Sequence, residues 1–145
     1  MKRSAPIKRK RATPRRTTRP RCTTQRCKKA ATNGTWCLTH ATRRADTMMS
    51  KHVRELQPYC ERCGATTALQ WAHIFSRKYR SVRWSKDNYK ILDARCHAYF
   101  THHPAEWEQW CRDEGVDWDG LRVRALNDPP QDPLDIIHWL KGDGP

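Results

Sequence analysis

Apolar side chains recur at close to the 3.6-residue period of an α-helix between Thr39 and about Leu56. The recurring positions are Ala41, Ala45, Met48, Met49, His52, Val53 and Leu56. Basic side chains fall mainly between them, so the pattern predicts an amphipathic helix that packs a narrow apolar stripe on the following domain. We expect this helix to end at Gln57-Pro58, because a residue that precedes proline disfavours the helical conformation.

Two short apolar runs farther along the chain predict a pair of β-strands. Leu69–Phe75 has the composition of a strand, and Tyr89–Leu92 is a second, shorter one. Between them the chain is polar and basic, and Asp87-Asn88 is expected to form the turn into the second strand. His73 therefore falls at or near the end of the first strand.

Helical patterns follow the second strand. We expect one helix to start at Cys96, with His97 in its first turn, and another to span residues 104–113. A short helix is predicted near Leu134–Leu140. Two strands followed by helices predict a small α+β protein.

The composition limits the core that this chain can build. Apolar residues make up 37% of the 145 residues and charged residues 30%, so little buried area offsets the entropy of ordering the chain. The seven cysteines are the expected source of extra stability. No apolar run approaches the ~18 residues of a membrane span, and a signal peptide is not evident, so we expect a cytoplasmic protein without membrane contact. In that compartment, closely paired cysteines favour metal over disulfides.

The net charge of +14 is unevenly distributed. Residues 1–45 contain no Asp or Glu, whereas residues 113–145 form an acidic C-terminal extension. Residues 1–21 carry almost no apolar side chain, which predicts a disordered basic arm that lies along nucleic-acid phosphates. We therefore expect DNA as the partner rather than a membrane or a small-molecule substrate, with a solubility tail or an acidic protein partner as the alternatives.

The first candidate metal site consists of two ligand pairs, Cys22 with Cys27 and Cys37 with His40. Each pair can hold a metal ion from one turn, and the loop between the pairs brings them together. Four such ligands suit a tetrahedral zinc ion. Because no polar group typical of catalysis lies nearby, we predict a structural zinc knuckle over residues 22–45 and a linking helix over residues 46–58; unpaired thiols are the alternative.

A second candidate metal site begins at Cys60 and Cys63 and includes Cys96. Such sites usually take their other two ligands from a second Cys-x-x-Cys, but Asp93 stands where the first of these cysteines is expected. A carboxylate oxygen can bind zinc, so we favour Asp93 as the fourth ligand over Cys111, which lies beyond a predicted helix. The chain is thus expected to hold about two structural zinc ions.

The order of elements between Cys60 and about Trp110 resembles that of the HNH endonuclease family. A strand ending in histidine, a loop, Asp-Asn, a second strand, Cys-His and a helix follow one another as in the ββα-metal core of that family. The chain looks most like the small HNH nucleases of bacteriophages, including recombination endonucleases, and residues 22–45 are similar to zinc knuckles that precede such cores. The resemblance implies a nuclease core over residues 59–112 that hydrolyses DNA phosphodiester bonds in a bacterial or phage-infected cell.

The resemblance also implies a role for each polar residue of this core. His73 matches the general base that takes a proton from the attacking water. Asn88 matches the residue that holds the loop between the strands and keeps the base oriented. His97 matches a ligand of a catalytic divalent ion, which nitrogen ligands alone do not identify as Mg²⁺, Mn²⁺, Ni²⁺ or Zn²⁺.

The chain departs from the family at Ala72, where many members carry Asp or His as a metal ligand. We expect His102 to supply the missing nitrogen, with His103 as the alternative ligand and two surface histidines as the simpler interpretation. The departure also favours a second function, a catalytically weak or inert zinc-stabilised nucleic-acid-binding protein. A zinc scaffold for protein partners is a third.

A basic stretch follows His73 along the chain. It contains Arg77, Lys78, Arg80 and Arg83. Beside a catalytic histidine, these side chains are expected to grip the phosphates of DNA, with a solvated loop as the alternative. Branched DNA, packaging-site DNA and plain duplex fit the pattern equally, and the pattern does not predict an oligomeric state.

Overall fold

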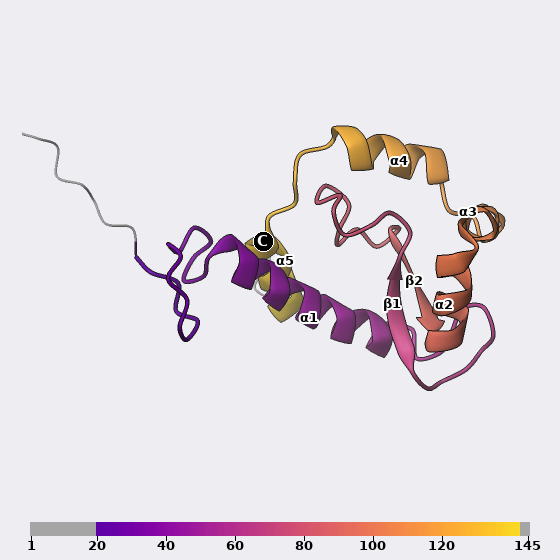
Figure 1. Ribbon diagram of the computed structural model, residues 1–145, viewed down its shortest axis with the longest axis horizontal. Coiled ribbons are helices and arrows are strands. Elements are labelled where there is room, and N and C mark those ends of the chain that lie inside the picture. The colour runs from indigo at the N-terminus through magenta and orange to yellow at the C-terminus, as the bar shows by residue number, and fades with distance from the viewer. Residues whose placement is uncertain (1–19, 143–145) are drawn as a thin grey trace, which may run out of the picture.

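The computed structural model describes residues 20–142. Residues 1–19 and 143–145 lie outside the described part, and most of the predicted basic arm falls among them. The described chain contains five helices and one two-stranded sheet (Figure 1), which confirms a small protein of mixed helix and strand. Among the described residues, no helix combines the length and the apolar character needed to cross a membrane.

Helix α1 (Leu38–Leu56) forms where the helical spacing of apolar residues predicts it. Its buried positions are Ala41, Ala45, Met49 and Val53, which share one face. The helix ends at Gln57, as predicted from the proline that follows. It is uninterrupted from Leu38, so the boundary between residues 45 and 46, predicted to separate the knuckle from the linking helix, falls inside one helix.

Strands β1 (Leu69–His73) and β2 (Tyr89–Asp93) form an antiparallel pair whose register places His73 opposite Tyr89. β1 ends before its predicted end at Phe75. The Phe75 N–H donates a hydrogen bond of 2.7 Å to the side-chain oxygen of Asn88 instead of to a strand carbonyl. His73 is therefore the last residue of the strand. The Ile74 N–H still donates to the Asn88 carbonyl at 3.0 Å, and the chain leaves the sheet after that bond.

The hairpin lies between α1 on one side and α2 (Ala94–His102) on the other (Figure 1). Side chains alternate between the two faces of a strand. Trp71 and Ile91 consequently pack in the core formed with α1, whereas Ala72 and Leu92 pack in the core formed with α2. The sheet thus separates two small cores, and neighbouring residues of β1 face different helices.

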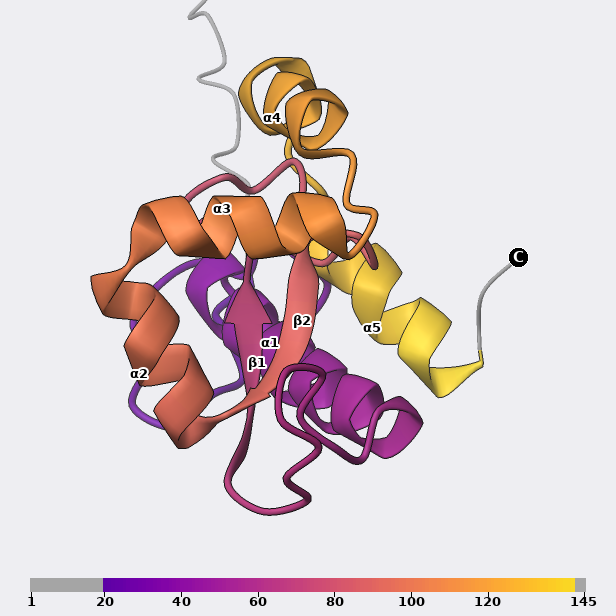
Figure 2. The same cartoon turned by 90° about the vertical axis from the view of Figure 1, so that its right-hand side faces the viewer.

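Helix α2 starts at Ala94, two residues before its predicted start at Cys96. The reason is that Asp93 caps it, since a side-chain oxygen of Asp93 accepts a hydrogen bond of 2.6 Å from the Cys96 N–H. His103 separates α2 from α3 (Pro104–Asp113), which has its predicted bounds. Helix α3 crosses the hairpin at the end that carries His73 (Figure 2).

The acidic C-terminal extension is packed against the rest of the protein. Helix α4 (Trp118–Asn127), which the sequence pattern did not predict, buries Leu121 in a cluster with Val82 of the loop between the strands. Helix α5 (Pro133–Lys141) confirms the helix predicted near residues 134–140, and it packs along α1 with Ile137 buried. Both helices therefore support the elements that carry the candidate site.

Candidate metal centres and histidine pocket

The first ligand cluster is assembled as the sequence predicted. The ligand atoms of Cys22, Cys27, Cys37 and His40 all lie within 4.8 Å of one another. The Nδ1 atom of His40 is 3.3 Å from the Sγ atoms of both Cys22 and Cys37. Four ligand atoms around a common point can hold one metal ion, and three sulfurs with one imidazole nitrogen suit zinc.

Local turns of the backbone bring these four ligands together. The Cys22 N–H donates to the Lys29 carbonyl and the Cys27 N–H to the Thr24 carbonyl, each at 3.0 Å, which folds the first pair into a compact turn. Gly34, at φ +59°, then reverses the chain in a conformation that glycine adopts without strain. The second pair lies at the start of α1.

Hydrogen bonds favour the thiolate form of one ligand of this cluster, Cys22. Burial alone would raise the pKa of the Cys22 thiol, but hydrogen bonds from Thr24, Cys37 and His40 outweigh burial and lower that pKa to about 5. Cys22 is therefore a thiolate at neutral pH. The thiolate is the form of cysteine that binds metal.

The second cluster contains the ligands that the sequence favoured. The ligand atoms of Cys60, Cys63, Asp93 and Cys96 lie within 4.8 Å of one another, so this group can hold a second metal ion. The rival ligand Cys111 is fully buried in a different cluster, with Leu121 of α4. Burial raises the pKa of the Cys111 thiol to about 12, so Cys111 stays a neutral thiol and packs as a core residue.

Asp93 has two roles in this cluster. One carboxylate oxygen accepts the Cys96 N–H at 2.6 Å and caps α2, and the other lies 3.6 Å from the Cys63 sulfur. The Cys96 N–H is also the main reason that the pKa of Asp93 lies below its usual value, with the Arg95 guanidinium contributing less. A metal ion held by Asp93 would therefore be joined directly to the start of the helix that carries His97.

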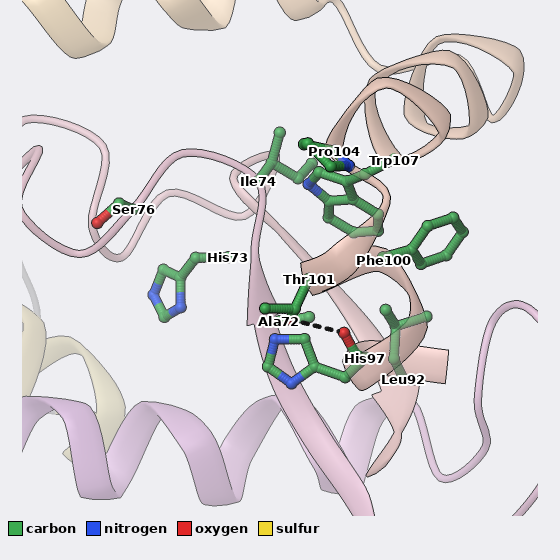
Figure 3. A pocket seen from close by; sticks show the side chains of 10 residues that line it. All are labelled: Ala72, His73, Ile74, Ser76, Leu92, His97, Phe100, Thr101, Pro104 and Trp107. Atoms are coloured by element: carbon green, nitrogen blue, oxygen red, sulfur yellow. Dashed lines mark hydrogen bonds between the residues drawn. The ribbon is translucent and has the colours of Figure 1, made fainter. Parts of the chain in front are cut away.

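His73 and His97 line one cavity of about 250 Å³ between the end of β1 and helices α2 and α3. His73 extends from the strand end and His97 from α2 (Figure 3). The remaining wall is largely apolar and includes Ala72, Phe100 and Trp107. Both histidines thus line this pocket, His97 from the α2 side of the sheet and His73 from the strand end, where its ring packs beside Trp71 of the core formed with α1.

The orientation of His73 is fixed by the loop that follows β1. Its Nε2 atom lies 3.1 Å from the backbone carbonyl of Arg83, and its Nδ1 atom lies 3.5 Å from the Arg77 Nε. A carbonyl only accepts hydrogen bonds, so Nε2 carries the proton and Nδ1 keeps the lone pair. Burial, reinforced by the positive charge of Arg77, lowers the pKa of His73 to about 4. His73 is therefore neutral at neutral pH.

Asn88 is fully buried and ties down the same loop. Its side-chain oxygen accepts the Phe75 N–H at 2.7 Å, and its amide donates to the carbonyls of Phe75 at 3.1 Å and Val82 at 2.9 Å. None of these hydrogen bonds joins Asn88 to His73. It instead fixes the backbone two residues beyond His73.

Replacing Asn88 by alanine should lower the free energy of unfolding by about 3 kcal/mol, because buried hydrogen-bonding groups of the loop would lose their partners. The control is Asn127→Ala, which removes a comparable side-chain hydrogen bond, to Val123, on the exposed face of α4. That substitution should cost about 0.5 kcal/mol or less. Urea unfolding with zinc present measures both. Equal losses in the two variants would contradict the structural role of Asn88.

His97 is oriented by a residue that the sequence did not single out. Its Nδ1 atom lies 2.6 Å from the side-chain oxygen of Gln70, a β1 residue on the α2 side of the sheet. An amide oxygen accepts, so Nδ1 carries the proton and Nε2 is left with its lone pair. His97 thus presents one nitrogen donor for a cation.

The predicted second ligand of a catalytic ion is not brought to His97. Ala72 is buried on the α2 side of the sheet and provides no donor atom. His102 is exposed and does not line the pocket, because five residues along an α-helix place it about 140° around the axis from His97. His103 stacks on Tyr99 and bonds its carbonyl at 2.7 Å. Neither histidine can be assigned as the ligand predicted from the sequence.

The four basic residues predicted to grip phosphate fall into two groups. Arg77 and Lys78 are exposed and Arg80 is partly so. Arg83 is instead held by Asp46 of α1, with a nitrogen–oxygen distance of 2.6 Å and both side chains mostly shielded from solvent. We therefore remove Arg83 from the predicted phosphate contacts, since its guanidinium already has a carboxylate partner.

No family model, curated protein or solved structure matches this chain.

Proposed function

We propose that this protein is a metal-dependent DNA endonuclease of the HNH kind whose two cysteine-rich clusters hold structural zinc. The observation that carries the proposal is the pair of oriented imidazoles, His73 and His97, in one pocket at the end of a hairpin that α2 covers. One of them is a neutral base at neutral pH, and the other offers a nitrogen donor. Metal-assisted phosphodiester hydrolysis can use both groups, the first to activate water and the second to hold the ion.

In this proposal His73 takes a proton from the attacking water at Nδ1, while its Nε2–H remains bonded to the Arg83 carbonyl. Arg77 lies beside the same Nδ1 atom and is exposed. An incoming phosphate would draw the Arg77 guanidinium toward its oxygens, because a charged acceptor forms a stronger hydrogen bond than an imidazole nitrogen does. Arg77 would then hold the phosphate and leave Nδ1 open to water.

The pocket can provide only part of the coordination of a divalent ion. The chain supplies the Nε2 atom of His97, and Ala72 adds no donor. DNA phosphate oxygens and water would have to complete the coordination, so the ion would bind weakly without substrate. When bound, such an ion supplies charge stabilisation to the phosphate and the leaving oxygen.

The charge of the chain supports DNA as the substrate. The net charge is +14, and residues 1–45 contain no acidic side chain. Arg77 and Lys78 place exposed positive charge beside the pocket. Contacts of this kind hold phosphates without distinguishing base sequence, so they bring the backbone to the histidines.

A second candidate function is nucleic-acid binding without cleavage. The observation in its favour is Ala72, which occupies the face of β1 that points to α2 and leaves His97 without a second protein ligand. The zinc clusters and the basic loop would serve this function equally well.

Supercoiled plasmid nicking distinguishes the two functions. Protein purified without chelators, so that its structural metal stays in place, should nick plasmid when Mg²⁺, Mn²⁺, Ni²⁺ or Zn²⁺ is added and should be nearly inactive without addition. His138→Ala, which alters an exposed histidine of α5, should cut like the wild type. DNA binding without nicking under every metal would reject the nuclease and favour the binder.

A further inference from the structure

Asp46 lies on α1, outside the predicted nuclease core, yet it is bonded to the loop that carries the base. Its carboxylate accepts from the Arg83 Nε at 2.9 Å, from the Arg83 Nη2 at 2.6 Å and from the Trp84 Nε1 at 2.9 Å. The side chains of Asp46 and Arg83 are only 18% and 16% exposed. This two-pronged, shielded contact fixes both the direction and the position of the guanidinium.

Arg83 passes this constraint to His73. Its backbone carbonyl accepts the Nε2–H of His73 at 3.1 Å, and its Nη1 donates to the Arg77 carbonyl at 2.7 Å. Arg77 in turn contacts the other ring nitrogen of His73. Arg83 therefore acts on both ring nitrogens of His73. Its own carbonyl contacts Nε2, and its side chain holds the backbone of Arg77, whose guanidinium contacts Nδ1.

Other contacts also restrain this loop. Between Ile74 and Asn88 it forms turns and contains no strand pairing in the described structure. Asn88, at the end of the loop, bonds Phe75 at its start and Val82 in its middle. The Ser81 hydroxyl donates to the Ala125 carbonyl at 2.9 Å, and Gln131 accepts the Trp84 N–H at 2.9 Å. Asp46 is the acidic residue that ties the middle of the loop to a helix of the core.

We propose that Asp46 is a positioning residue for the base: through Arg83 it holds His73 in the tautomer protonated at Nε2, which leaves Nδ1 with its lone pair beside Arg77. The proposal rests on the function proposed above for His73. Its physical basis is that a shielded carboxylate facing a guanidinium cannot be neutralised without leaving the arginine uncompensated. Arg83 would then turn toward water and release the carbonyl of Arg77.

The decisive variant is Asp46→Asn, which keeps the shape of the side chain and removes its charge. Displacing a catalytic group by about 1 Å costs on the order of 10²-fold in rate, so we expect kcat to fall by roughly 10- to 100-fold. The Kd for DNA should stay within about twofold, because Asp46 is mostly shielded from solvent and is not one of the groups proposed to contact phosphate. Asp46→Glu, which restores the charge, should recover part of the rate.

A second measurement does not depend on cleavage. The ¹⁵N chemical shifts of the His73 ring should show one dominant tautomer, protonated at Nε2, in the wild type. They should show a mixture in Asp46→Asn. This result would stand even if the wild type cut no DNA, so failure of the proposed nuclease function and failure of the positioning role are distinguishable.

Asp87→Asn is the matched control. Asp87 lies near the other end of the same loop and pairs with Arg124 of α4, with both side chains nearly half exposed. Exposed ion pairs contribute little, so the cleavage rate and the His73 tautomer of this variant should match the wild type.

If Asp46→Asn does not fold, Arg83→Lys tests the same link. Lysine keeps the charge but lacks the forked guanidinium that reaches both Asp46 and the Arg77 carbonyl. An unchanged His73 tautomer in the folded variant overturns the proposal.

Discussion

Replacing Cys60 by serine is expected to unfold the hairpin and α2 rather than to weaken them. Cys60 is buried and, with Cys63, Asp93 and Cys96, forms one of the two clusters that can hold a metal ion. Zinc bound to small domains contributes about 10–16 kcal/mol of apparent free energy, whereas a whole domain is typically stable by only about 5–15 kcal/mol. Without such an ion, we expect the small cores on either side of the sheet to be insufficient to hold the fold.

Zinc analysis and circular dichroism measure this effect. Protein purified without added metal should contain about two zinc ions per chain, and Cys60→Ser about one or fewer with a large loss of ordered structure. Cys111→Ala is the control, since Cys111 is a buried cysteine that belongs to neither cluster. It should keep the full zinc content and lose only the stability that a small cavity costs. A Cys60→Ser protein with wild-type structure and no zinc would contradict the structural role of the metal.

The metal clusters could be predicted because their cysteine ligands occur in pairs that are close together in the sequence. Cys22 and Cys27, like Cys60 and Cys63, lie close enough for one turn to aim both sulfurs at a common point. Asp93 could be favoured for a similar local reason, since it directly precedes the helix that contains Cys96. What spacing did not indicate is that Asp93 also caps that helix.

The support of His73 could not be predicted in this way. Asp46 and Arg83 are separated by 37 positions, and Trp84 and Gln131 by 47, so no periodic pattern relates them. Arg83 belongs to a run of basic residues that all look like phosphate ligands in the sequence. Only the packing of α1 beside the loop shows that one of them already has a carboxylate partner.

Helix α4 was missed for a related reason. Its sequence contains Gly120 in the first turn, and glycine weakens a helical pattern. The helix is stabilised by a cap, in which Asp117 accepts the Gly120 N–H at 3.0 Å, and by burial of Leu121 against residues far earlier in the chain. Tertiary contacts therefore override a weak local preference.

Replacing His73 by alanine should reduce cleavage by roughly 10²- to 10⁴-fold, the contribution of a positioned general base, and leave zinc content and DNA binding close to the wild type. His73 packs at the strand end beside Trp71, so its loss exposes part of that ring but breaks no metal cluster.

His97→Ala should also abolish most cleavage, but for a different reason. A lost ligand weakens binding of the ion, so a higher divalent concentration should partly restore the rate, whereas no concentration restores His73→Ala.

The pH dependence tests the same base independently of substitution. Burial and the charge of Arg77 lower the pKa of His73 from its usual 6.5 to about 4, so the folded protein keeps the imidazole neutral as the pH falls through 6.5. Between pH 7.5 and 5.5, with metal saturating, the rate attributable to His73 should stay nearly constant. A histidine with the usual pKa would lose about tenfold in rate over that range.

The same lowered pKa also affects stability. The unfolded chain takes up a proton at a higher pH than the folded protein does, so His73 lowers the stability of the fold as the pH falls below 6.5. Wild-type and His73→Ala proteins that cut equally well, or a rate that falls with an apparent pKa near 6.5 at saturating metal, would show that this imidazole is not the base.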